Sequence, residues 1–224
     1  KRLQKEEKML KADIKYNIEI DGLNKIKALL EDGKPARNVE LTDEEKETVK
    51  DLFLLTSKPI IYIANVEEEQ LPNIENDENV KKVKEIAKQE NTKCIPLCAK
   101  IEEELSGLDD SDKKEMLEAL GLKESGLDTV IRESYDLLGL MSFLTAGEPE
   151  VRAWTIKKGT KAPEAAGKIH SDIQRGFIKA EIVSYDDLIR EGGMVAAKEK
   201  GLVRSEGKDY IMQDGDIVLF KFNV

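Results

Sequence analysis

The stretch from Lys58 to Glu68 constrains the fold of this chain more than any other. Its first half is a short apolar run rich in isoleucine, bounded by Pro59 and by polar residues, which is typical of a strand buried on both faces of a parallel sheet. In its second half Asn65 and Glu68 lie three residues apart, just beyond the predicted carboxyl end of the strand. Open α/β sheets bind ligands at these strand ends, because the loops there converge on a crevice. The stretch therefore predicts an α/β domain with a ligand site at Asn65.

The side chain of Asn65 carries both a donor and an acceptor, so it can hold the N6/N7 edge of a purine with two hydrogen bonds. We interpret Asn65 as the base-reading residue of a nucleotide site. The alternative is that Asn65 simply ends a strand and that the Glu68 carboxylate is solvated, and the spacing alone leaves this alternative open.

A second strand is predicted over Lys93–Ala99, after a polar loop over Asn73–Asn79 and an amphipathic helix over Val80–Ala87. Strand, helix and strand in this order indicate a parallel crossover, which places the Asn65 loop and the Cys98 loop side by side at one edge of the sheet. We interpret Cys94 as a core thiol. Its spacing from Cys98 is not that of a zinc ribbon, and the sequence has no second cysteine pair.

The first 32 residues are highly charged, with apolar residues spaced at three or four, and they predict a helical hairpin with its turn near Ala12 and Asp13. Gly33 followed by Pro35 is a normal helix stop. The alternative is an ordinary solvated helix packed on a core. From Thr42 to Glu45 the sequence forms a capping box, which predicts a helix that ends near Leu55, with Val49, Leu52 and Phe53 facing inward.

Further helices are predicted over Asp112–Leu120, behind Ser111, and over Leu127–Leu138, behind Ser125, and the pattern changes after Gly139. Beyond that boundary the segments 151–156 and 217–222 alternate as half-buried strands do, and a Gly-Glu-Pro turn is expected at 147–149. A hairpin, a helix and further strands of a mixed sheet predict a small β-grasp-like domain.

The net charge of −10 is unevenly spread over the 224 residues, because the first 139 carry 33 acidic and 23 basic residues while the remainder is balanced at 13 each. The tail is therefore better suited than the acidic part to approach an anionic partner.

Two closely spaced cysteines indicate reduced thiols and a cytoplasmic protein, and no run of apolar residues reaches the length of a membrane span. We expect a monomer, and we expect the chain to be a piece of a longer protein because it begins at Lys1 inside a charged helical pattern.

Nearly the whole chain from Gly33 onward resembles the YchF/Obg-like ATPases, P-loop proteins of the translation-factor class. The stretches that carry the resemblance are Tyr62–Glu68, Phe143–Gly147, Val151–Ile156, Ala165–His170, Gly176–Glu181, Glu206–Tyr210 and the C-terminal Asp-Gly-Asp-Ile-Val-Leu-Phe-Lys-Phe-Asn-Val.

The resemblance implies three parts: residues 1–33 as part of a helical (coiled-coil) insertion, 34–139 as the C-terminal half of the nucleotide-binding G domain, and 140–224 as a TGS domain with a ubiquitin-like β-grasp fold. It also implies hydrolysis of ATP in preference to GTP, and association with ribosomes.

The chain departs from the family at the phosphate site. The G-x-x-x-x-G-K-[ST] loop, whose Ser or Thr holds Mg²⁺, occurs nowhere in these 224 residues. We therefore expect the residues that bind Mg²⁺ to lie outside this chain, the chain alone to be inactive, and the intact protein to be the hydrolase.

The resemblance also assigns the base loops. Asn65, Val66 and Glu68 stand where many GTPases have Asn-Lys-x-Asp, and Cys98, Ala99 and Lys100 stand where they have Ser-Ala-Lys. Val66 removes the lysine stem that packs over the base, and the longer Glu68 moves the carboxylate that would meet guanine. Since one bidentate contact is worth about 1–3 kcal/mol of base discrimination, this change favours adenine or makes the site indifferent.

The alternative function is a non-catalytic module that binds RNA or the ribosome through the TGS domain and the hairpin. For that purpose a basic face could form beside Trp154, which is available for stacking. We interpret His170 as structural and Asp214-Gly-Asp216 as a turn rather than a metal site. The lysines and arginines considered for the basic face are Arg152, Lys157, Lys158, Lys179 and Lys221.

Overall fold

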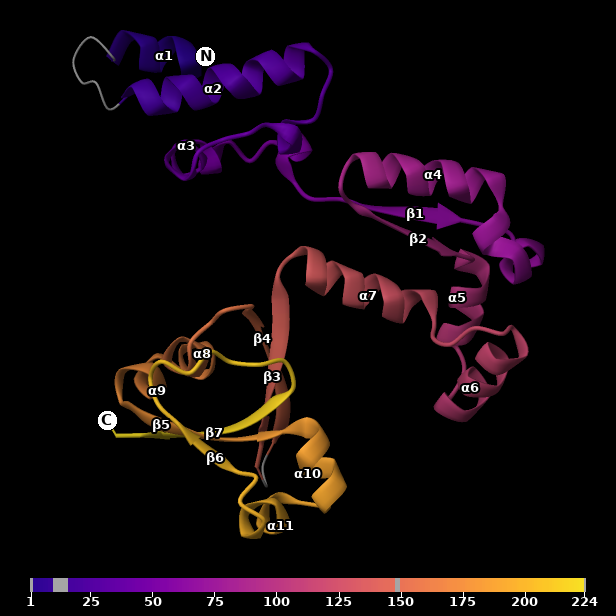
Figure 1. Cartoon of the computed structure of the whole chain (residues 1–224), viewed down its shortest axis with the longest axis vertical. Helices are drawn as coiled ribbons and strands as arrows, with labels where there is room; N and C mark the ends of the chain where they lie inside the picture. The colour runs from indigo at the N-terminus through magenta and orange to yellow at the C-terminus, as the bar shows by residue number, and fades with distance from the viewer. Residues whose placement is uncertain (1, 10–15, 148–149, 224) are drawn as a thin grey trace. The chain divides into compact units, whose positions relative to one another are not determined.

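The computed structural model describes residues 2–9, 16–147 and 150–223 (Figure 1). The chain divides into two compact units, Lys1–Val130 and Ile131–Val224. The division falls inside helix α7 (Gly126–Leu137), several residues before the change of pattern at Gly139. Each unit has its own buried apolar clusters, so each is described by itself.

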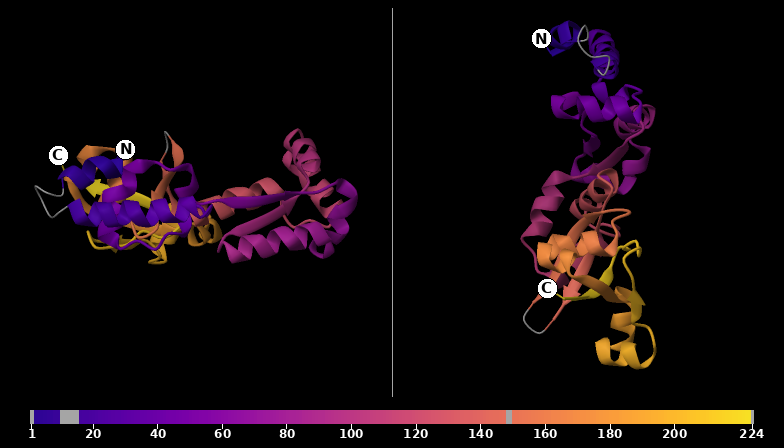
Figure 2. Two further views of the ribbon diagram at one scale, coloured as in Figure 1. Left: turned by 90° about the horizontal axis from the view of Figure 1, so that it is seen from above. Right: turned by 90° about the vertical axis from the view of Figure 1, so that its left-hand side faces the viewer.

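The first part of unit 1 is helical. Helices α1 (Arg2–Met9) and α2 (Tyr16–Glu31) lie antiparallel, and α3 (Asp43–Val49) packs on α2 (Figures 1 and 2). The expected hairpin turn at Ala12 and Asp13 lies outside the described residues. The cluster between α2 and α3 consists of Leu23, Ile26, Ala36 and Val49.

The predicted capping box of α3 is confirmed. Thr42 Oγ1 accepts the Glu45 amide at 3.2 Å, and a Glu45 carboxylate oxygen accepts the Thr42 amide at 2.8 Å. The predicted end of the helix was wrong, because α3 stops at Val49 and a 3-10 turn over Lys50–Leu52 follows. Phe53 then takes a left-handed conformation, with φ of +48°, and turns its ring outward to 82% exposure.

A pH-dependent contribution to stability follows from Glu45. Its carboxylate accepts two bonds from Lys25, at 2.7 and 2.9 Å, and these bonds together with the Thr42 amide lower its pKa below the ordinary value. A carboxyl whose pKa is lower in the folded state stabilises the fold above its unfolded pKa, and the stabilisation is lost as pH falls through the folded value.

We therefore expect Glu45→Gln to lower the free energy of unfolding at pH 7, and the difference from the parent chain to be smaller at pH 3. Urea unfolding followed by circular dichroism at both pH values measures this difference. Glu44→Gln, which changes an exposed neighbour on α3, is the matched control. A deficit of the same size at both pH values would contradict the assignment.

The second part of unit 1 contains the predicted strand pair. Strands β1 (Ile61–Asn65) and β2 (Lys93–Leu97) are parallel, in a register that sets Ile61 opposite Lys93 and Asn65 opposite Leu97. The connection between them contains α4 (Glu78–Gln89), whose N-terminus is capped by Asp77, and α4 lies along both strands (Figure 1). The parallel crossover predicted from the sequence is thereby confirmed.

Three local predictions in this part were wrong. Strand β1 is not buried on both faces, because Ile63 is 46% exposed: it faces away from the buried Ala64, and β1 pairs only with β2 among the described strands. The expected polar loop at 73–79 is mostly helical, since a 3-10 segment covers Glu68–Asn76 and α4 begins at Glu78. Helix α6 (Asp110–Ala119), which follows α5 (Ala99–Ser106), begins behind Asp109 rather than Ser111.

Unit 2 is built on a mixed five-stranded sheet in the order β4-β3-β7-β5-β6. Strands β3 and β7 are parallel and the other neighbouring pairs are antiparallel. The expected Gly-Glu-Pro turn between β3 and β4 includes residues 148 and 149, which lie outside the described residues. In chain order the elements are β3 (Leu140–Ala146), β4 (Val151–Lys157), α8 (Ala162–Ile169), α9 (Ser171–Arg175), β5 (Phe177–Ser184), α10 (Tyr185–Glu191), α11 (Met194–Glu199), β6 (Arg204–Glu206) and β7 (Asp216–Phe222).

The two faces of this sheet differ. One face packs on α8 in the largest buried cluster, where Phe143 is fully buried against the rings of Trp154 and Phe220. The other face, called the open face below, carries Leu144, Glu181 and Leu219 and is covered at one end by α10 and α11. The predicted alternation of β4 and β7 is confirmed, because side chains on one side of each strand enter the cluster.

The residues considered for a basic face are divided between the two faces of the sheet. Arg152 lies over the Trp154 ring, 4.2 Å from its centroid, on the side that packs on α8. Lys179 and Lys221 lie on the open face because they alternate with core residues. Strand pleating therefore separates Trp154 from these two lysines, and a continuous basic face with a stacking ring does not form.

Candidate functional site

The two predicted loops meet at the carboxyl end of the β1–β2 pair. The amide of Val66 continues the ladder by donating to Leu97 O at 2.9 Å. One residue earlier, Asn65 Oδ1 accepts the amide of Ala99 at 2.9 Å. Asn65 and Ala99 are both exposed, so this bond joins the two loops at an accessible edge of the sheet.

The bond leaves part of Asn65 available to a ligand. It occupies one of the two lone pairs of Oδ1 and does not use Nδ2. Ala99 is also the first residue of α5, and the amides of the first turn of a helix have no partner within the helix. Asn65 thus satisfies one of these amides while its own NH₂ group can still donate to a ring nitrogen.

Glu68 and Lys100 lie across the same edge from one another. Lys100 Nζ donates to Glu68 Oε2 at 3.2 Å, and both side chains are at least half exposed. This bond raises the pKa of the Lys100 ammonium group above its ordinary value. The ion pair holds the Glu68 carboxylate on the Cys98–Lys100 loop.

The remaining two predicted residues point into the core. Val66 and Cys98 are 8% and 4% exposed and belong to one buried cluster with Ile101 and Leu105. Their side chains shape the two loops from beneath, and only their backbone groups can reach the accessible edge. Burial raises the pKa of the Cys94 thiol, as is typical of a thiol that packs in a core.

One supporting residue was not foreseen. The side chain of Gln70 accepts the Glu67 amide at 2.8 Å and donates to Asp77, the cap of α4, at 2.8 Å. It therefore ties the loop after β1 to the start of α4. The signal in the sequence was the Glu67-x-x-Gln70 spacing, which has the form of a capping box.

Comparison with known proteins decides the family. The ribosome-binding ATPase YchF of Bacillus subtilis is 54% identical over 223 residues, which span 100% of this chain and 60% of that protein. The solved structure of the Schizosaccharomyces pombe YchF GTPase has a TM-score of 0.82 and 32% identity, and the match covers 98% of this chain and 60% of that one. This chain belongs to the YchF family.

Other matches agree with this assignment. Residues 140–223 match the family model YchF-GTPase_C, described as a protein of unknown function (DUF933). The ribosome-binding ATPase YchF of Escherichia coli O157:H7 is 45% identical over all of this chain and 60% of that protein. A GTP-binding protein from Pyrococcus horikoshii, at 20% identity and a TM-score of 0.53, shares the fold. The chain thus spans about 60% of the length of the relatives from Bacillus subtilis and Escherichia coli O157:H7.

Other polar candidates in this YchF-family chain have structural roles. His170 Nδ1 accepts the Asp172 amide at 3.2 Å and caps α9. Asp214 accepts the Ser142 amide at 2.8 Å at the turn into β7, and Asp216 accepts the Tyr210 hydroxyl at 2.9 Å.

Within the described ranges, no group of three or more His, Cys, Asp or Glu side chains could hold a metal ion. No helix in the same ranges has the length and apolar composition that crossing a bilayer requires.

Proposed function

We propose that this chain carries the base-recognition part of a purine nucleotide-binding ATPase that prefers ATP to GTP. The observation that carries the proposal is the Asn65–Ala99 bond, which joins the two loops at an accessible edge while leaving the Asn65 amide group free to donate. In this assignment Asn65 reads the base, Ala99 and Lys100 flank it at the start of α5, and Val66, Glu68 and Cys98 shape the two loops.

The arrangement suits adenine better than guanine. Asn65 Nδ2 can donate to N7, and the second lone pair of Oδ1 can accept from the N6 amino group of adenine. Guanine has a carbonyl oxygen in place of that amino group, so Asn65 Oδ1 would face a second acceptor. A carboxylate that binds N1 and N2 of guanine could compensate for this loss. The carboxylate available here is that of Glu68, and Lys100 holds it on the neighbouring loop.

Phosphate handling is assigned to a part of the parent protein outside this chain. Phosphoryl transfer needs a phosphate cradle and Mg²⁺, and the sequence contains no phosphate loop while the described residues offer no metal-binding cluster. When bound, Mg²⁺ would neutralise charge on the phosphates. We propose that this chain alone is inactive.

We also propose that unit 2 is a TGS domain of the β-grasp type. The mixed five-stranded sheet of this unit supports that proposal.

We further propose that the parent protein is a cytoplasmic monomer that associates with ribosomes. The support is the name ribosome-binding ATPase carried by the relatives from Bacillus subtilis and Escherichia coli O157:H7. Co-sedimentation of the full-length protein with ribosomes tests the association, and its absence at low salt would refute it.

Base preference can be tested by restoring the shorter carboxylate found in many GTPases. In the full-length protein, Glu68→Asp is expected to raise the affinity for GTP relative to ATP by about tenfold, because one recovered bidentate contact is worth about 1–3 kcal/mol. Titration with fluorescent ATP and GTP analogues measures the ratio.

The matched control is Glu85→Asp, the same replacement at an exposed residue of α4 away from the loops. An unchanged ratio in the loop variant, with both nucleotides still bound, would contradict the proposed base contacts. A protein that binds neither nucleotide before substitution would refute the function itself.

A further inference from the structure

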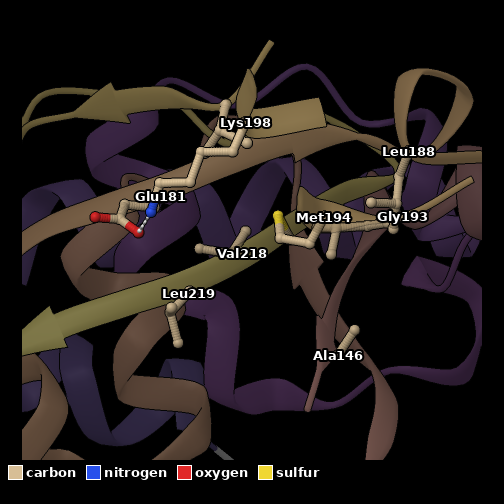
Figure 3. A pocket seen from close by; sticks show the side chains of 10 residues that line it. Ala146, Glu181, Leu188, Gly193, Met194, Lys198, Val218 and Leu219 are labelled. Carbon is tan, nitrogen blue, oxygen red and sulfur yellow. Dashed lines mark ion pairs between the residues drawn. The ribbon is translucent and has the colours of Figure 1, made fainter. Parts of the chain in front are cut away.

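Unit 2 contains a pocket of about 320 Å³ between the open face of the sheet and helix α11 (Figure 3). Its walls are mainly apolar: Ala146 comes from β3, Ile217 and Leu219 from β7, and Met194 from the start of α11. This volume is sufficient for one or two apolar side chains or for a small ligand. Methionine adapts its shape readily and is common in binding surfaces that accept varied apolar groups.

The apolar surface continues beyond the pocket. Val151, which pairs with Ala146 across the β3–β4 ladder, is 72% exposed, and Leu219 is 51% exposed. Ala153, two residues along β4 on the same face, is also exposed. These side chains make a strip on the open face that extends the wall of the pocket, so the surface is longer than a small molecule needs.

Positive charge gathers at one side of the pocket, where Glu181 and Lys198 belong to the lining and two further lysines lie beside them. Glu181 on β5 lies within 3.4 Å of Lys179, 3.8 Å of Lys198 and 4.0 Å of Lys221, and Lys198 reaches it from α11 (Figure 3). Three ammonium groups thus surround a single carboxylate, which leaves a local excess of positive charge in a chain whose net charge is −10.

Glu181 remains ionised in this setting. Burial raises the pKa of its carboxyl, but the bond from Lys179 and the charges of Lys198 and Lys221 together outweigh the effect of burial and lower it below the ordinary value. The lysines are 44–67% exposed, so each can turn toward a second anion at little cost.

We propose that this pocket is a docking site for an acidic amphipathic segment of a partner protein. An apolar side chain of the segment enters between Met194 and Leu219, and its carboxylates meet Lys179, Lys198 and Lys221. Charge complementarity selects an anionic partner. The apolar lining, which contains no aromatic ring on which a base could stack, favours a peptide over a nucleic acid.

The site is independent of the proposed nucleotide function, because every residue that lines it belongs to unit 2, whereas the base loops belong to unit 1. A test of one therefore does not decide the other.

The test uses the intact chain and three fluorescent probes: an amphipathic peptide of leucine and glutamate, the matched peptide of leucine and lysine, and a single-stranded oligouridine. We expect saturable binding of the leucine–glutamate peptide by fluorescence anisotropy, at least tenfold tighter than that of the leucine–lysine peptide. Lys198→Glu and Leu219→Asp should each weaken it by about tenfold, through charge repulsion and loss of apolar contact respectively.

Lys208→Glu changes an exposed lysine away from the pocket and should leave the affinity within twofold. Unchanged Trp154 fluorescence shows that unit 2 of each variant is folded. Because the Lys198 side chain is exposed, Lys198→Glu does not disturb the core. The proposal is overturned if the leucine–glutamate peptide does not bind, if both peptides bind equally, if Lys198→Glu behaves like Lys208→Glu, or if oligouridine competes for the site.

Discussion

Replacing Asn65 by alanine in the full-length protein is expected to weaken the binding of ATP by about 5- to 150-fold, the equivalent of about 1–3 kcal/mol for a bidentate base contact. The substitution removes the amide group that donates to the base. It also removes the oxygen that accepts the Ala99 amide at 2.9 Å, and in the parent protein this hydrogen bond joins the two loops. Titration of a fluorescent ATP analogue measures the loss directly.

Asn38→Ala is the matched control, since Asn38 is an exposed asparagine of the same unit in a short 3-10 turn. This control should bind ATP as the parent protein does. Co-sedimentation with ribosomes at saturating ATP should be retained by both variants, which separates a local loss at the base loop from a general loss of fold. If Asn65→Ala binds ATP with the parent affinity, the base-reading role of Asn65 is wrong.

Phe143→Ala is expected to destabilise unit 2 by about 3–5 kcal/mol, the usual cost of removing a fully buried aromatic ring. Phe143 has no exposed surface, and its ring centroid lies 6.5 Å from that of Trp154 and 5.9 Å from that of Phe220. Close packing on several sides limits how far the neighbours can move into the space left behind, so a cavity remains.

Trp154 is the only tryptophan of the chain, so its fluorescence during urea unfolding reports on unit 2 alone. Phe222→Ala is the control, because that ring is 45% exposed at the end of β7 and its removal should cost less than about 1 kcal/mol. Equal effects of the two substitutions would show that the cluster around Phe143 does not dominate the stability of this unit.

Patterns between near neighbours in the sequence predicted the local structure well. The capping box of Thr42 and Glu45 and the alternation in β4 and β7 depend on groups a few residues apart, whose relative positions follow from backbone geometry. The parallel pairing of β1 and β2 followed from the order of strand, helix and strand, because few topologies connect such elements. The resemblance carried by Tyr62–Glu68 and the stretches after it indicated the family.

Errors arose where burial depends on partners distant in the sequence. The apolar composition of β1 indicated two covered faces, but nothing within the stretch specifies what lies against Ile63. Phe53 satisfied a helical pattern, yet the helix ended four residues earlier and the left-handed turn moved its ring to the surface. The proposed basic face failed because the direction in which each lysine points depends on strand register.

The sequence by itself determined the order of elements and the residues of the two loops. Tertiary structure alone decided how these residues act together: Asn65 meets Ala99 and Glu68 meets Lys100 across more than thirty residues, while Val66 and Cys98 turn inward. The reason is physical. Local patterns fix backbone conformation, whereas a hydrogen bond between distant side chains exists only after strand pairing has fixed the register that brings their atoms within about 3 Å.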